Sequence, residues 1–121
     1  MDEFVLFFRM DILTKEAQPT PEQMSVYMEQ WRHWTEDIAA QGKLSEGGNH
    51  LSSEGRVIRP GNQINNGPYT EKRESVAGYI IIKATDFDDA VAIANECPIL
   101  QGEGTSVEVR KVEAPDAPEK F

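Results

Sequence analysis

The chain has 121 residues, which fits one domain large enough to bury a hydrophobic core without disulfides or metals. Asp and Glu number 21 against 12 Lys and Arg, and a net charge of −9 disfavours non-specific binding to nucleic acid or anionic membranes. Cys97 is the only cysteine, so the chain forms no internal disulfide. The N-terminus is acidic and its apolar run at 4–8 is short for a signal peptide or membrane span, which indicates a cytoplasmic protein.

Two segments, 3–10 and 77–84, are predicted to be strands with apolar side chains on both faces. In the first, one face carries Phe4, Leu6, Phe8 and Met10, and the other carries Val5 and Phe7. In the second, Tyr79 and Ile81 alternate with Ile80 and Ile82. Both faces of each strand should therefore be covered in the folded protein.

Two helices are predicted. Thr20 has the features of an N-cap, with Pro21 at the first helical position and Gln23 completing a capping box, and Gly42 is a natural C-terminal stop. The helical period between them is marked by Met24, Tyr27, Met28, Trp31, Trp34 and Ile38. Asp86 begins the second helix, which ends before Pro98 and has a predicted buried stripe of Phe87, Ala90, Val91 and Ala94.

Three further segments complete the pattern. Residues 43–51 are predicted to form a strand that is broken or bulged at Gly47–Gly48. Residues 56–59 and 63–65 flank the turn sequence Pro60–Gly61–Asn62 and are predicted to form a short hairpin. Residues 106–112 alternate cleanly and are predicted to be the last strand.

The order of elements predicts an α+β fold, a ferredoxin-like βαββαβ arrangement with an inserted β-hairpin and both helices on one face of an antiparallel sheet. The domain spans residues 1–112, and residues 113–121 form a Pro-rich acidic tail that is loose or draped over a partner. The second apolar face of the sheet needs a cover, which a second copy supplies most simply. We therefore expect a homodimer through the sheet face.

The passage from Asn66 to Lys72, followed by Ala77–Gly78–Tyr79, resembles the "DGPF" signature of the YCII-related (DGPF-domain) family. That signature is Asp-Gly-Pro-Phe, a short charged stretch and Gly-Gly-Tyr. The likeness continues through Gly42–Leu44 with Gly47–Gly48, Asp86–Ala90, Cys97–Pro98 and Val107–Arg110. It implies a dimeric α/β barrel made of two ferredoxin-like units. Asn66 and Tyr69 replace the usual Asp and Phe of the motif.

In shorter YCII-type members, a His on the first helix and an Asp after the following strand form a proposed acid–base dyad. The best-matching helix position here is near Gln30, and an amide cannot accept and release a proton near neutral pH. The dyad therefore does not carry over to this chain. Some members are labelled as transcription-related, and the charge balance gives that label no support.

Three residues are candidates for proton transfer: His50 at the predicted bend, its neighbour Glu46, and the hydroxyl of Tyr69. The alternative for His50 is a loop histidine hydrogen-bonded to backbone. His33 falls on the solvent side of the first helix and is interpreted as an ordinary surface residue. Cys97 precedes Pro98 at a helix end and is interpreted as a buried structural thiol.

Four residues are candidates for ligand binding. Gln30, Trp34 and Tyr27 share one edge of the first helix with Gln23, and such an edge can wall a pocket. Asn66 offers an amide if its turn lines a cleft between sheet and helix. The alternatives are core packing for Trp34 and a purely structural role for the Asn66–Gly67–Pro68–Tyr69 turn.

The sequence contains no spacing typical of a zinc site and no nucleotide-binding or nucleophile-elbow motif, so we expect no metal and no cofactor. The leading hypothesis is a small dimeric barrel that binds a small polar or acidic molecule in a cleft, with lyase- or isomerase-type proton transfer as its chemistry. The alternative is a non-catalytic binding or interaction protein, and the most remote is a transcription-related regulator.

Overall fold

The computed structural model describes residues 1–11, 20–52, 54–67, 75–102 and 104–113. Within them the order of elements is β1 (Asp2–Met10), α1 (Pro21–Ala40), β2 (Leu44–His50), β3 (Gly55–Arg59), β4 (Gln63–Gly67), β5 (Ser75–Ala84), α2 (Phe87–Ala94), the 3₁₀ helix η3 (Pro98–Gln101) and β6 (Ser106–Lys111). The bounds agree with the predicted elements to within two residues, except that α2 ends at Ala94 rather than just before Pro98 and that η3 was not predicted. Most of the predicted tail lies outside the described residues.

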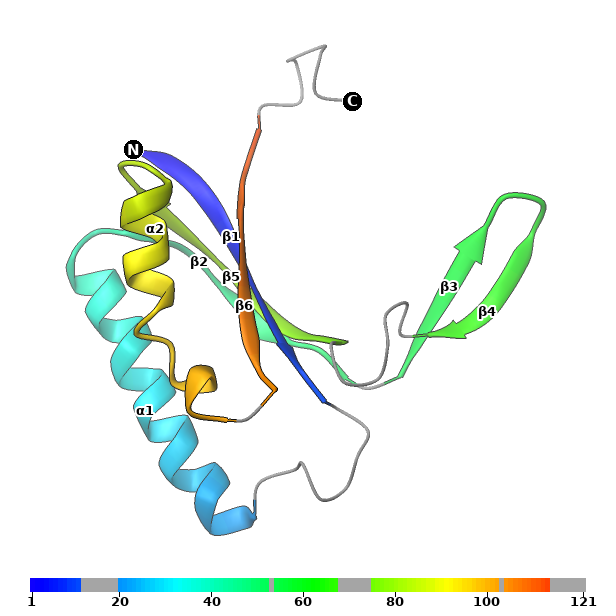
Figure 1. Cartoon of the computed structure of the whole chain (residues 1–121), viewed down its shortest axis with the longest axis horizontal. Helices are drawn as coiled ribbons and strands as arrows, with labels where there is room; N and C mark the ends of the chain where they lie inside the picture. The colour runs from blue at the N-terminus through cyan, green and yellow to red at the C-terminus, as the bar shows by residue number, and fades with distance from the viewer. Residues whose placement is uncertain (12–19, 53, 68–74, 103, 114–121) are drawn as a thin grey trace.

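The described residues form a four-stranded antiparallel sheet in the order β2-β5-β1-β6, and a separate two-stranded sheet of β3 and β4. Both α-helices lie on one side of the larger sheet, and the β3–β4 hairpin extends on the other side (Figure 1). The predicted α+β fold is confirmed, and the sheet order is that of a ferredoxin-like arrangement.

The core lies between the sheet and the helices, on the side that we call the helix face. From β1 it contains Phe4, Leu6 and Phe8, which alternate along the strand as predicted. The remaining buried or packed members come from the other elements and include Trp34, Ile38, Ile80, Ile82, Ala90, Ala94, Val107 and Val109. Burial of these side chains is the main stabilising contribution to the fold.

The predicted buried stripe of α2 is wrong in part. Ala90 and Ala94 are buried, but Phe87 is 48% exposed and Val91 is 52% exposed. At about 100° per residue, Phe87 and Val91 both lie on one flank of the alanine stripe. The small alanines allow α2 to lie close to the sheet, and Phe87 touches Phe4 edge-on from the flank, with ring centroids 4.9 Å apart.

The ends of α1 follow the predicted signals. The Thr20 hydroxyl accepts a hydrogen bond from the Gln23 backbone N–H, and the Gln23 side chain accepts one from the Thr20 N–H, which completes the capping box. Gly42 follows the helix with a φ of +72°, the left-handed conformation typical of helix termination. The Trp34 indole N–H donates to the Ile93 carbonyl at 3.1 Å and so fixes α1 against α2.

The opposite side of the sheet, here called the open face, has an apolar centre made of two cross-strand pairs, Val5 with Ile81 and Phe7 with Tyr79. All four side chains are half-buried. At the margin, Arg9 on β1 forms a 2.9 Å ion pair with Glu108 on β6. No described helix covers this face. Separately, none of the described helices is both long and apolar enough to cross a membrane.

Candidate functional site

The bulge in β2 decides where the predicted catalytic side chains lie. The pairing of β2 with β5 shifts register between Leu44 and Glu46 and again between Glu46 and Asn49. Glu46 pairs with Ile81 and therefore points to the open face, whereas His50 pairs with Gly78 and points to the helix face. The structure thus separates Glu46 from His50, although they are only four residues apart.

His50 lies beside an aromatic group on α1. The centroid of its ring is 5.8 Å from that of Trp31. Tyr27 stacks on Trp31 with a centroid distance of 6.4 Å and an interplanar angle of 22°. Tyr27 and Trp31 are half-buried and His50 is exposed, so the three rings form one accessible patch, which we call the aromatic surface.

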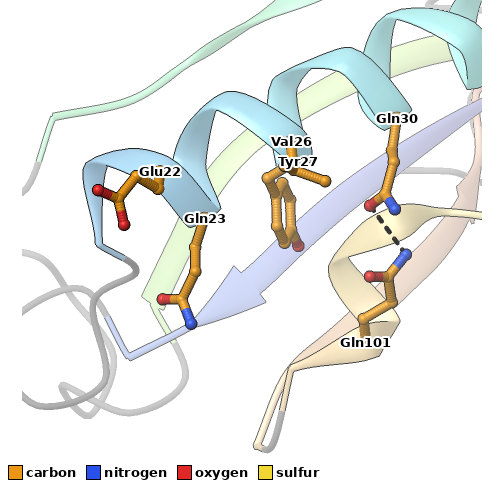
Figure 2. A pocket seen from close by; sticks show the side chains of 6 residues that line it. All are labelled: Glu22, Gln23, Val26, Tyr27, Gln30 and Gln101. Carbon is orange, nitrogen blue, oxygen red and sulfur yellow. Dashed lines mark hydrogen bonds between the residues drawn. The ribbon is translucent and has the colours of Figure 1, made fainter.

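A shallow hollow of about 380 Å³ adjoins the aromatic surface through Tyr27, within the size range of small-molecule sites. Its walls come from the first half of α1 and from η3, and they consist of Glu22, Gln23, Val26, Tyr27, Gln30 and Gln101 (Figure 2). The Gln101 amide N–H donates to the Gln30 side-chain carbonyl at 3.1 Å and closes one end. Three of the lining side chains are amides, which donate and accept hydrogen bonds without titrating.

Two ionisable groups near the hollow are held in their neutral forms. Burial raises the pKa of the Tyr27 hydroxyl to about 12, with a smaller contribution from nearby Cys97. Burial also raises the pKa of the Cys97 thiol to about 12. At neutral pH, Tyr27 is therefore a hydrogen-bond donor or acceptor rather than a base, and Cys97 is not a nucleophile.

The predicted ligand-binding residues divide into two groups. Tyr27 and Gln30 line the hollow, and Trp34 lies one turn further along α1, where a second, larger groove runs between α1 and α2. Trp34 is 6% exposed and already bonded to Ile93, so it contributes mainly packing. Asn66 is on β4, paired with Arg56 in the hairpin, on the opposite side of the sheet from α1. Tyr69 lies outside the described residues.

Sequence reasoning missed two members of the site. The helical period identifies Trp31 only as an apolar position of α1, yet Trp31 makes the contact with His50. Gln101 belongs to no predicted element, and the sequence contains no signal that joins it to Gln30, which is 71 residues away.

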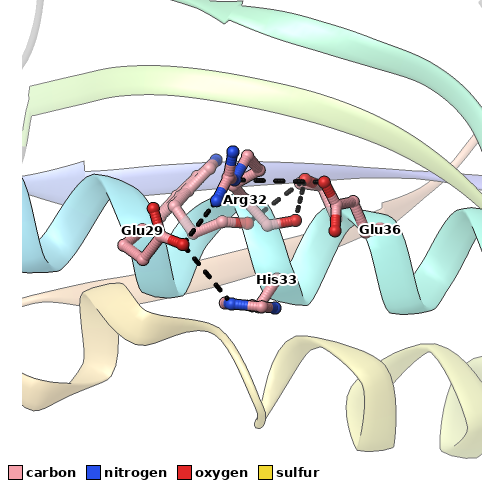
Figure 3. A network of polar contacts seen from close by, with 6 residues as sticks. Glu29, Arg32, His33 and Glu36 are labelled. Carbon is pink, nitrogen blue, oxygen red and sulfur yellow. Dashed lines mark hydrogen bonds and ion pairs between the residues drawn. The ribbon is translucent and has the colours of Figure 1, made fainter.

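His33 lies on the exposed side of α1, as predicted, with 67% of its side chain exposed. Its Nε2 is 3.5 Å from Glu29, which also pairs with Arg32 (Figure 3). Arg32 reaches Glu36 at 3.9 Å. These are surface pairs that contribute little to stability, and they indicate a solvated helix face. Within the described ranges, no three His, Cys, Asp or Glu side chains come together as a metal site would require.

A family model described as the YCII-related domain matches residues 9–113, which include every described element except β1, of which only Arg9 and Met10 fall inside the match. No curated protein matches the chain. Since the matched region covers most of the sequence, the chain belongs to the YCII-related domain family.

Proposed function

We propose that this protein binds a small, flat organic acid on the aromatic surface of Tyr27, Trp31 and His50. The observation that carries the proposal is the Trp31–His50 contact at 5.8 Å, next to the stacked Tyr27 ring. An indole face stacks on planar unsaturated groups, and a protonated imidazole pairs with a carboxylate. The amides of the adjoining hollow provide further hydrogen bonds to a polar substituent.

If the protein is also catalytic, we propose that His50 moves the proton. Among the described candidates it alone lies on the aromatic surface, because Glu46 points to the open face. Histidine exchanges protons readily near neutral pH. The chemistry would then be a cofactor-independent lyase or isomerase step next to the carboxylate of the bound acid. The alternative is a non-catalytic binding protein that uses the same surface.

The test is to titrate the protein with two flat acids, benzoate and cinnamate, and with one saturated acid, succinate. Calorimetry and tryptophan emission measure the binding. Trp34→Phe leaves Trp31 as the only tryptophan. We expect the flat acids to bind more tightly than succinate, and His50→Ala to weaken their binding by about tenfold or more, the size of a charge-assisted hydrogen bond.

His33→Ala is the matched control, because it removes an exposed histidine of α1 that lines the groove between α1 and α2 and is not part of the aromatic surface. It should leave binding unchanged. Equal affinities for wild type and His50→Ala, or no binding of any of the acids, would contradict the proposal. If wild type turns over an unsaturated acid and His50→Ala does not, the result would also support the proposed proton transfer by His50.

We also propose that the functional unit is a homodimer joined through the open faces. The apolar centre of Val5, Phe7, Tyr79 and Ile81 with a charged margin has the composition of an interface core and rim. In a two-fold dimer the same patch meets itself, so one self-complementary surface covers both copies. The resemblance to dimeric α/β barrels supports the same assembly.

Sedimentation at micromolar concentration tests the dimer. Val5→Lys places a charge in the centre of the open face and should give a monomer, since two like charges meet across the two-fold axis. Val91→Lys is the control, because Val91 is an exposed valine on α2, on the helix side of the sheet. A wild-type protein that remains monomeric would contradict the proposed dimer.

A further inference from the structure

The β3–β4 hairpin, residues 55–67, is here called the arm. It carries the most exposed pair of large apolar side chains among the described elements, Ile58 at 76% and Ile64 at 65%. The two residues are register partners, so their side chains lie side by side on one face of the arm. Single exposed apolar residues are ordinary on protein surfaces, but a paired apolar face on an exposed hairpin indicates a contact.

The arm packs against little else in its own subunit. β3 and β4 form a sheet of their own and pack chiefly on each other. A two-stranded hairpin is at best marginally stable by itself in water. Figure 1 shows the arm extending from the end of β2 and β5 on the side of the sheet away from the helices. It therefore projects on the same side as the open face.

Charge indicates what the arm contacts. Residues 55–67 contain Arg56 and Arg59 but no Asp or Glu, so all 21 acidic residues of the chain lie elsewhere, one of them Glu54, which pairs with Arg56 at 3.2 Å. A second copy of this chain offers an acidic body complementary to the basic arm. It also offers apolar surface, since each copy has an open face of its own.

We propose that each arm reaches across to the second copy and buries Ile58 and Ile64 against it, beside the joined open faces. This inference rests on the proposed dimer and specifies an additional part of its interface. Strand alternation places Arg56 and Asn66 on the same face of the arm as the two isoleucines. Asn66 is therefore presented to the second copy and not to the helix side of its own sheet.

The experiment is sedimentation equilibrium on the full chain, comparing wild type with Ile58→Ser/Ile64→Ser. Each dimer buries these side chains twice, so we expect the dissociation constant to rise by at least about a hundredfold. The control is Gln63→Ser/Asn65→Ser, which alters the other face of the same arm. The control should dimerise like wild type, and circular dichroism should show that both variants are folded.

Hydrogen exchange gives a second readout that does not depend on substitution. Amides of residues 55–67 should exchange more slowly at concentrations where wild type is a dimer than on dilution to the monomer. Two results would overturn the arm contact but leave the sheet-face dimer standing. In the first, wild type dimerises but the arm exchanges equally fast at both concentrations. In the second, wild type and the isoleucine variant dimerise equally well. A wild-type protein that is monomeric at all concentrations overturns both.

Discussion

The backbone of Gly48 lies directly against the carbonyl group of Tyr79. A Cβ atom built on Gly48 would be 1.6 Å from the Tyr79 carbonyl oxygen, and Gly48 itself has a φ of +67°. This close approach is the centre of the β2 bulge. The bulge shifts the register so that Glu46 faces one side of the sheet and His50 faces the other, next to Trp31.

Gly48→Ala should therefore be severely destabilising. The positive φ alone costs about 1 kcal/mol for a residue with a side chain, and the overlap with Tyr79 forces β2 away from β5. We expect a total loss of about 3 kcal/mol or more in the free energy of unfolding, measured by urea denaturation. Gly47→Ala is the matched control, because a Cβ there meets nothing within 4 Å. Equal effects at the two positions would contradict this account of the bulge.

The local signals in the sequence predict the elements well, because each acts over a few residues. Thr20 with Gln23 predicts the start of α1, and the alternation around Leu6 predicts the buried side of β1. The bulge at Gly47–Gly48 was also predictable from the paired glycines. What composition does not reveal is how many residues the bulge absorbs, and that number decides the face on which His50 lies.

The site was predicted only in part, because its contacts join distant segments. Tyr27 and Gln30 follow from the helical period, but Gln101 joins them through a fold-dependent hydrogen bond. Asn66 was a candidate for lining a cleft between sheet and helix, with a purely structural role for its turn as the alternative. In the structure it belongs to the arm, and its position depends on where the hairpin points, which strand patterns do not encode.

Trp34→Phe should destabilise the protein more than Trp31→Phe. The Trp34 indole N–H donates a hydrogen bond to the Ile93 carbonyl, and the residue is only 6% exposed. Trp34→Phe therefore removes both this hydrogen bond and packing between α1 and α2. We expect a loss of about 1–3 kcal/mol in the free energy of unfolding. Trp31 is half-buried, and Phe keeps its edge contact with Phe8, so its substitution should cost less than about 1 kcal/mol. A larger cost for Trp31→Phe would contradict this ranking.

The Cys97 thiol should be unreactive in the folded protein. It is buried, and burial raises its pKa to about 12, so the thiolate form that attacks disulfide reagents is scarce at pH 8. We expect an aromatic disulfide reagent to label Cys97 at the rate of global or local opening, and at once in concentrated urea. Rapid stoichiometric labelling without denaturant would show that the thiol is accessible.

The free energy of unfolding should fall at acidic pH, partly because the Asp89 carboxylate becomes protonated. The Thr85 backbone N–H donates to its carboxylate at 3.0 Å and the Lys43 ammonium at 3.1 Å, and these hydrogen bonds lower the pKa of Asp89 below its usual value. A carboxyl whose pKa is lower in the folded than in the unfolded chain stabilises the fold at pH values above the unfolded pKa of about 4. That contribution disappears as the pH falls through the folded value.

Asp89→Asn should therefore reduce the free energy of unfolding at pH 6–7, and the difference from wild type should shrink steadily as the pH falls from about 5 to 3. Urea denaturation at each pH measures this difference. Asp88→Asn is the matched control, because Asp88 is exposed on the same first turn of α2 and its loss removes the same favourable charge from the helix N-terminus. If Asp89→Asn and Asp88→Asn showed the same pH dependence, the hydrogen bonds from Thr85 and Lys43 would not be its cause.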